Sequence, residues 1–249
     1  MTTPAQPGPT YQEYVAWDAP TRWFHWINVL AVLGLIATGV VILAGGQLGL
    51  SPDGKLVLKS VHVVFGYIMG VNLLWRFVWA FFGNRYARWR SILPGGRGFG
   101  AALRAYVASF LTGEPEQYVG HNPLARVGVT LLLLLLLVQV ITGLVLAGTD
   151  LYWAPFGAFI ADWVAAPGVD PGTLVPGSKE LWDAAAYQTM RDFRGPVVET
   201  HEITFYLLAA AVVIHIAAIV VTELHEGGSI TTAMFTGRKI LSRKPPDAL

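Results

Sequence analysis

The sequence predicts an all-α integral membrane protein built as a bundle of four transmembrane helices. Of its 249 residues, 54% are hydrophobic and only 13% are charged, whereas charged residues make up about 25% of ordinary soluble domains. Nine tryptophans and nine tyrosines suit the aromatic belts found at membrane surfaces. Four apolar stretches are each long enough to cross a hydrocarbon core about 30 Å thick.

Residues 1–16 are predicted to form a flexible N-terminal tail, because they begin with the proline-rich run MTTPAQPGPT and lack the basic region of a signal peptide. Asp18 and Pro20 favour a helix start, since a proline in the first turn loses no hydrogen bond. A first span is predicted at 23–44 and a second at 56–82.

The next connection is basic and contains a predicted surface helix from Gly98 to Leu111. A third span follows at 124–147. It is centred on seven consecutive leucines and carries only Arg126 near its entry. We therefore expect this helix to be a wall that faces lipid.

The loop at 148–198 is long enough to be functional by the usual distribution of loop lengths. Short surface helices are predicted at 153–166 and 178–193. Pro196 is expected to open the fourth span, at 199–223. The four spans belong to one domain at 17–241, and a C-terminal tail follows at 242–249.

The basic residues outside the spans predict the orientation. Ten lysines and arginines flank the face that holds both termini and the second connection, and four flank the opposite face. Positively charged flanks stay in the cytoplasm. We therefore expect a multi-pass protein of the bacterial cytoplasmic (inner) membrane, with both termini cytoplasmic and the long loop on the periplasmic side.

Histidines occur at matched depths in three of the spans. His201 and His215 are fourteen residues apart, which places them on one helix face and roughly 21 Å apart along the axis. His62 enters the second span from the same side as His201, and His25 lies near the cytoplasmic start of the first span. Two pairs follow, His62 with His201 and His25 with His215. Cofactor sites of helix bundles are built between facing helices in this way.

Paired imidazoles in an apolar bundle suit two non-covalent b-type haems. The chain has no cysteine, which excludes iron–sulfur clusters held by thiolates and the thioether attachment of a c-type haem. Two axial histidines leave no open position on the iron, so such a centre transfers electrons. Arg76, fourteen residues after His62, and Arg22, three before His25, are candidate partners for the haem propionates.

The Gly120–Pro123 turn carries a candidate quinone contact. His121 can exchange protons near neutral pH and the Asn122 amide can donate a hydrogen bond to a quinone oxygen. The alternative is structural, because Asn before Pro is also an ordinary start signal for a helix.

Several segments resemble the bacterial cytochrome b561 superfamily, and in particular the cytochrome b subunit of membrane-bound nickel–iron hydrogenases. The segments are WDAPTRWFHWINV (17–29), RFVWAFFGNRYARW (76–89), GHNPLARVGV (120–129), HEITFYLLAAAVVIHIAAIVVTE (201–223) and TTAMFTGRK (231–239). The resemblance implies a di-haem electron-transfer subunit of an oxidoreductase complex, which links a periplasmic donor to the quinone pool. It implies His25, His62, His201 and His215 as the iron ligands.

Other functions stay open at this point. The donor could be another periplasmic dehydrogenase or a c-type cytochrome, or the protein could work alone as a quinone-reactive redox carrier. A transporter or proton channel could use the same histidines as titrating groups. A purely structural anchor for a peripheral enzyme would need no cofactor.

Overall fold

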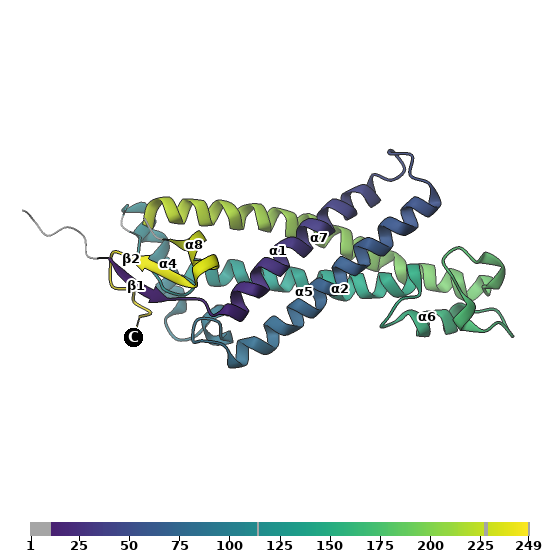
Figure 1. The fold of residues 1–249 in the computed structure, drawn as a ribbon, viewed down its shortest axis with the longest axis horizontal. Helices are drawn as coiled ribbons and strands as arrows, with labels where there is room; N and C mark the ends of the chain where they lie inside the picture. The colour runs from purple at the N-terminus through teal and green to yellow at the C-terminus, as the bar shows by residue number, and fades with distance from the viewer. Residues whose placement is uncertain (1–10, 114, 227–228, 249) are drawn as a thin grey trace, which may run out of the picture. The chain divides into compact units, whose positions relative to one another are not determined.

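Four long helices dominate the computed structural model, which describes residues 11–113, 115–226 and 229–248. They are α1 (Ala19–Leu43), α2 (Pro52–Phe82), α5 (Pro123–Leu151) and α7 (Ala184–Glu226) (Figure 1). Within the described ranges, these four are the helices long and apolar enough to cross a membrane. The chain is therefore an all-α, multi-pass membrane protein, as expected.

Polar side chains define where two of the long helices begin. Asp18 Oδ1 accepts a hydrogen bond from the Thr21 backbone N–H at 3.1 Å, and α1 starts at the next residue. Asn122 Oδ1 accepts one from the Ala125 N–H at 2.7 Å in front of α5. Each side chain satisfies an amide that has no partner inside its helix. Gly98, at φ 82°, precedes α4 (Phe99–Leu111), the predicted surface helix.

The start of the fourth helix was predicted wrongly. Helix α7 begins at Ala184, and Pro196 lies inside it instead of opening it. The stronger start signal is Asp183, whose Oδ1 accepts a hydrogen bond from the Ala186 N–H at 2.8 Å. Residues 184–198 are therefore helical, and they do not belong to a loop.

The connection between α5 and α7, residues 152–183, is folded and shorter than the predicted loop at 148–198. It contains α6 (Gly157–Val164), η1 (Pro171–Thr173) and η2 (Lys179–Leu181). Helix α6 lies in the predicted 153–166 segment, whereas 178–193 is not a separate helix but η2 followed by the first turns of α7. The connection and the first turns of α7 share a small hydrophobic core, which contains Ile160, Ala161, Val164, Leu174 and Met190.

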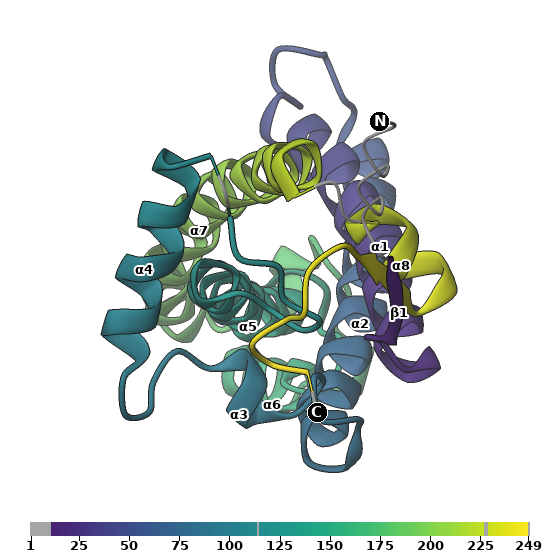
Figure 2. The same ribbon diagram turned by 90° about the vertical axis from the view of Figure 1, so that its left-hand side faces the viewer.

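The chain divides into two compact units, each built from parts of the same four helices. Unit 1 comprises residues 1–26, 74–133 and 210–249, and unit 2 comprises 27–73 and 134–209. Unit 1 adds α3 (Trp89–Ile92), α4 and α8 (Ile230–Thr236). In this unit α4 lies beside α7 (Figure 2), where the Tyr106 hydroxyl donates to Glu226 Oε1 at 2.9 Å.

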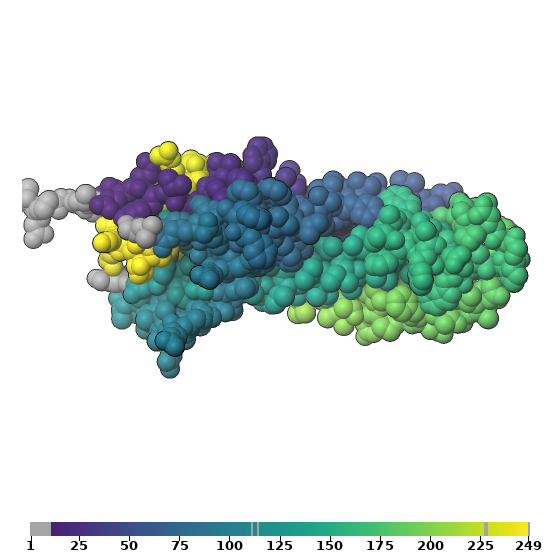
Figure 3. All heavy atoms as spheres, turned by 90° about the horizontal axis from the view of Figure 1, so that it is seen from below, coloured from purple at the N-terminus to yellow at the C-terminus, as the bar shows by residue number. Residues whose placement is uncertain are grey.

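Unit 1 also contains a two-stranded antiparallel sheet. Strand β1 (Gln12–Val15) pairs with β2 (Arg238–Leu241), so residues from the two ends of the sequence share one surface of this unit (Figure 3). Part of the expected flexible tail is thus a strand, because its backbone finds a partner far away in the sequence. Residues 1–10 lie outside the described part of the chain.

The expected C-terminal tail is also held in unit 1. The Asp247 carboxylate accepts hydrogen bonds from the Val119 and Gly120 N–H groups, both at 2.8 Å. Lys239, 6% exposed, donates to the carbonyls of Tyr118 at 3.0 Å and Gly120 at 3.2 Å. Together these bonds fix the turn that precedes α5.

Candidate functional site

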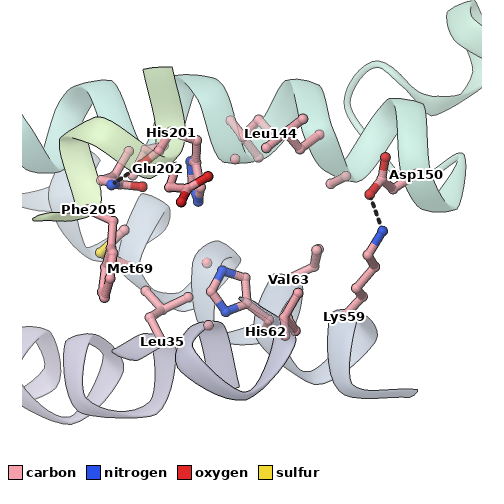
Figure 4. A pocket seen from close by; sticks show the side chains of 18 of the residues that line it. Leu35, Lys59, His62, Val63, Met69, Leu144, Asp150, His201, Glu202 and Phe205 are labelled. Carbon is pink, nitrogen blue, oxygen red and sulfur yellow. Dashed lines mark hydrogen bonds and ion pairs between the residues drawn. The ribbon is translucent and has the colours of Figure 1, made fainter. Parts of the chain in front are cut away.

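An apolar cavity of about 230 Å³ lies inside unit 2. Aliphatic and aromatic side chains of α1, α2, α5 and α7 form its walls, among them Val32, Ile36, Leu144 and Phe205. His62 from α2 and His201 from α7 point toward one another across it (Figure 4). Polar rings are costly among such neighbours unless they bind something there.

The distance between these two rings fits a shared metal ion. Their ring centres are 6.3 Å apart and their planes are inclined at 74°. Two metal–nitrogen bonds of about 2.0–2.1 Å, with roughly 1.1 Å from each nitrogen to its ring centre, place the ring centres about 6.3 Å apart. The pair is therefore spaced for one metal ion between the imidazoles.

A threonine on α1 orients His62. The Thr38 hydroxyl donates to the Gly34 carbonyl at 2.7 Å and lies 2.8 Å from His62 Nδ1. Because the hydroxyl proton is used, its oxygen accepts the proton of Nδ1–H. The other ring nitrogen, Nε2, is left unprotonated, which is the form that binds a metal.

Helix α5 orients His201 in the same way. The Thr142 hydroxyl donates to the Val138 carbonyl at 2.7 Å and lies 2.8 Å from His201 Nδ1. The Gln139 amide donates to the His201 carbonyl at 2.9 Å. Hydrogen bonds of this kind on the second nitrogen are typical of metal-bound histidines.

A glycine follows each of these threonines and faces the same ring. A Cβ added to Gly39 would lie 3.3 Å from His62 Cε1, and one added to Gly143 would lie 3.4 Å from His201 Cε1. Gly66 also lines the cavity, and a Cβ there would meet open space. The backbone thus leaves room for a large flat group beside both rings.

The other histidine pair lies in unit 1. His25 of α1 and His215 of α7 are both half-buried and lie within electrostatic range of each other. Nδ1 of His25 is buried and has no hydrogen-bond partner among the described residues. The structure brings these two residues into one unit, as it does His62 and His201.

Two arginines also belong to unit 1. Arg76 is 4% exposed, and its two terminal nitrogens donate to the Ala87 carbonyl at 3.0 and 3.1 Å. Arg22 donates to the Phe235 carbonyl, and its Nε is buried without a partner in the described ranges. Both guanidinium groups keep N–H donors that these contacts do not use.

The candidate quinone residues are already engaged with protein. Asn122 Oδ1 caps α5, as the structural alternative predicts, and its Nδ2 donates to the Tyr106 hydroxyl at 2.6 Å. The His121 ring lies 4.8 Å from the Trp17 ring. Burial, together with the charges of Lys239 and Arg76, lowers the pKa of His121 to about 3. This histidine is therefore neutral at pH 7 in the folded protein.

Sequence reasoning missed the two orienting threonines. Each stands in a similar local sequence, IATGVV at 36–41 and VITGLV at 140–145. The repeated Thr-Gly pair in the middle of an apolar span is the signal that could have revealed them. Helix α5 is consequently part of the site, although it was expected to be only a lipid-facing wall.

Comparison with known proteins shows the family of this chain. Residues 16–237 match the family described as prokaryotic cytochrome b561. The chain belongs to this family. The match covers all four long helices and all four candidate histidines, and it confirms the resemblance seen in the sequence motifs.

Relatives carry one recurring name, "Probable Ni/Fe-hydrogenase B-type cytochrome subunit". The protein of that name from Rhizobium leguminosarum bv. viciae is 28% identical over 244 residues, 92% of this chain and 90% of the relative. The Rhodobacter capsulatus protein is 37% identical over 120 residues, but the match spans only 44% of this chain and 45% of the relative. The protein from Escherichia coli K12 named "Probable Ni/Fe-hydrogenase 1 B-type cytochrome subunit" is 32% identical over 158 residues, 59% of this chain and 65% of the relative.

The family and the geometry together define what the chain does in outline. A cytochrome b561 carries b-type haem and transfers electrons in a membrane, and the four apolar helices provide the membrane location. The cavity between His62 and His201 has the walls, the ring spacing and the hydrogen-bonded imidazoles that fit such a haem.

Proposed function

We propose that the protein carries electrons across the membrane through two b-type haems, one held by His62 and His201 and the other by His25 and His215. The observation that supports this most strongly is the 6.3 Å separation of the His62 and His201 rings, each with its Nδ1 at 2.8 Å from a threonine hydroxyl. A b-type haem supplies reversible one-electron chemistry at its iron.

The side chains of the chain prepare each site for that chemistry. The paired histidines would hold the haem iron through Nε2, and an iron held by two histidines would have no position for oxygen or water. The threonines hold a proton at Nδ1 and fix each ring plane. The apolar walls exclude water, which limits the reorganisation that accompanies a change of charge. In unit 1, Arg76 and Arg22 are the proposed cationic partners for haem propionates.

We further propose a hydrogenase-like electron donor on the periplasmic side and quinone as the acceptor. The names of the relatives support the donor, and the distribution of basic residues supports cytoplasmic termini. The connection between α5 and α7 would then face the donor. It exposes aromatic and acidic side chains such as Phe159 and Asp162, a composition that suits a docking surface.

The haem assignment is tested by replacing one histidine at a time. His62→Ala and His201→Ala should each lower the haem content of the purified protein from two to one per chain, and His25→Ala and His215→Ala should remove the other haem. His225→Ala is a matched control, because this histidine is exposed on the same helix as His215. Absence of a Soret band in the wild type would favour the transporter or channel.

The donor and the quinone need separate experiments. Shortening the connection around α6 should abolish haem reduction by a hydrogenase partner while dithionite still reduces both haems. His121→Ala and Asn122→Ala should slow quinone-dependent oxidation of the haems at least tenfold, which corresponds to about 1.4 kcal/mol. Unchanged oxidation in both variants would leave these residues with their structural contacts alone.

A further inference from the structure

A partly buried ion cluster joins three helices at one edge of the apolar cavity in unit 2. Asp150 of α5 accepts from Arg194 of α7, with Nε–Oδ1 at 2.5 Å and a terminal nitrogen to Oδ2 at 2.8 Å. It also pairs with Lys59 of α2. The side chains of Lys59, Asp150 and Arg194 are only 29%, 14% and 22% exposed. Two cations thus share a single carboxylate.

These three residues line two cavities at once. They border the apolar cavity that holds His62 and His201, and also a second cavity of about 160 Å³. Polar side chains dominate the second cavity, and its charged lining consists of three bases and one acid, Lys59, Arg191, Arg194 and Asp150. An apolar chamber therefore adjoins a polar chamber with a net charge of +2.

The cations stand on the same side of both histidines. Lys59 is three residues before His62, and Arg194 is seven before His201, so each shares a helix face with its histidine. Figure 4 shows Lys59 and Asp150 joined at one edge of the cavity, away from the space between the two rings. A flat ligand held between the rings would meet positive charge along this one edge.

We propose that Lys59 and Arg194, assisted by Arg191, bind the two propionate carboxylates of the haem held by His62 and His201. The inference rests on the proposed function. An apolar macrocycle with two carboxylates on one edge matches an apolar chamber that opens on a chamber of charge +2. Asp150 holds the two cations in position and competes with the propionates for them.

The first test uses redox titration of the purified protein, in which the haem that disappears in His62→Ala is the one followed. Removing a nearby positive charge favours the oxidised, more positive iron. Lys59→Gln and Arg194→Gln should each lower the reduced-to-oxidised ratio of this haem about tenfold at fixed potential, which equals about 59 mV for a one-electron couple. Lys55→Gln, one turn earlier and exposed, should leave the ratio unchanged.

Asp150→Asn should change the reduced-to-oxidised ratio of this haem in the opposite direction. If the cations serve the propionates, removal of the competing carboxylate should raise the ratio and preserve the haem. If the three residues only form a structural ion cluster, Asp150→Asn should destabilise the protein with no upward shift, and that result would overturn the proposal. The double variant Asp150→Asn with Arg194→Gln removes both charges of this pair. Neither charge is then left without its partner in the protein interior.

Haem dimethyl ester, which has no free carboxylate, tests the ligand directly. Apo-protein should bind the ester at the His62–His201 site at least tenfold more weakly than haem b. Arg194→Gln should then lower the affinity for the ester only slightly further. If the cations instead bind a free anion in the polar chamber, Arg194→Gln should change the affinity for haem b and for the ester equally. That result would refute the assignment. If His62→Ala lost no haem, the proposed function itself would fail, whichever way the cation variants behaved.

Discussion

Replacing Thr38 or Thr142 by valine should weaken binding of the haem at His62 and His201 without changing its ligands. Valine has nearly the shape of threonine, but it cannot accept the Nδ1–H of the histidine that now lies 2.8 Å from the hydroxyl. A buried donor left without a partner costs about 1–3 kcal/mol, which is roughly a 5- to 150-fold loss of affinity. Loss of such a supporting contact typically costs 10–100-fold in metal affinity.

The assay is haem retention in detergent together with the midpoint potential of the haem that His62→Ala removes. The potential should rise in both variants, because an imidazole that no longer donates from Nδ1 is less basic and stabilises ferric iron less. Thr130→Val is the matched control. Thr130 lies on the same helix as Thr142, its hydroxyl donates to the Ile92 carbonyl at 3.3 Å, and it lines neither cavity of unit 2. Unchanged retention and potential in both valine variants would refute the role of the hydroxyls.

Three further changes probe the fold around the sites. Since burial and nearby cations lower the pKa of His121 to about 3, and the unfolded residue titrates near 6.5, stability should fall by about 1.4 kcal/mol per pH unit below 6.5. The melting temperature should therefore drop between pH 7 and 5, and less so in His121→Gln; parallel curves would contradict this. Asp18→Asn should cost about 1–2 kcal/mol in thermal unfolding, because its carboxylate accepts from two backbone amides and an indole. Gly34→Ala should cost about 1–3 kcal/mol, since its Cβ would lie 2.7 Å from the Phe65 ring, whereas Gly100→Ala on the surface helix should be harmless.

Local signals predicted the helices well, and they singled out the histidines as candidate ligands. Long apolar runs mark membrane spans because each apolar residue favours insertion into the lipid. Histidines such as His201 and His215 stand out because they are rare in such runs, and their spacing alone gives a common helix face. Neither inference requires knowledge of which helices are neighbours.

Contacts between distant segments could not be predicted in this way. Thr38 looks like an ordinary small residue of a span until α1 is placed beside His62. Lys59, Asp150 and Arg194 come from three helices, and the sequence places Arg194 in a loop because Pro196 is a local signal for a helix start. Strand β1 was assigned to a flexible tail, since nothing in its own four residues indicates pairing with residues 238–241.

The pairing of β1 with β2 has a consequence for biosynthesis. Unit 2 uses no residue beyond Ala209, so the cavity between His62 and His201 can form before α8 and β2 have left the ribosome. Unit 1 must wait, because β1 is made early and its partner strand is made late. Segments that pair only after a long delay stay exposed until then. The order in which the two units are completed thus follows from the connectivity: unit 2, with His62 and His201, first, and unit 1, with His25 and His215, last.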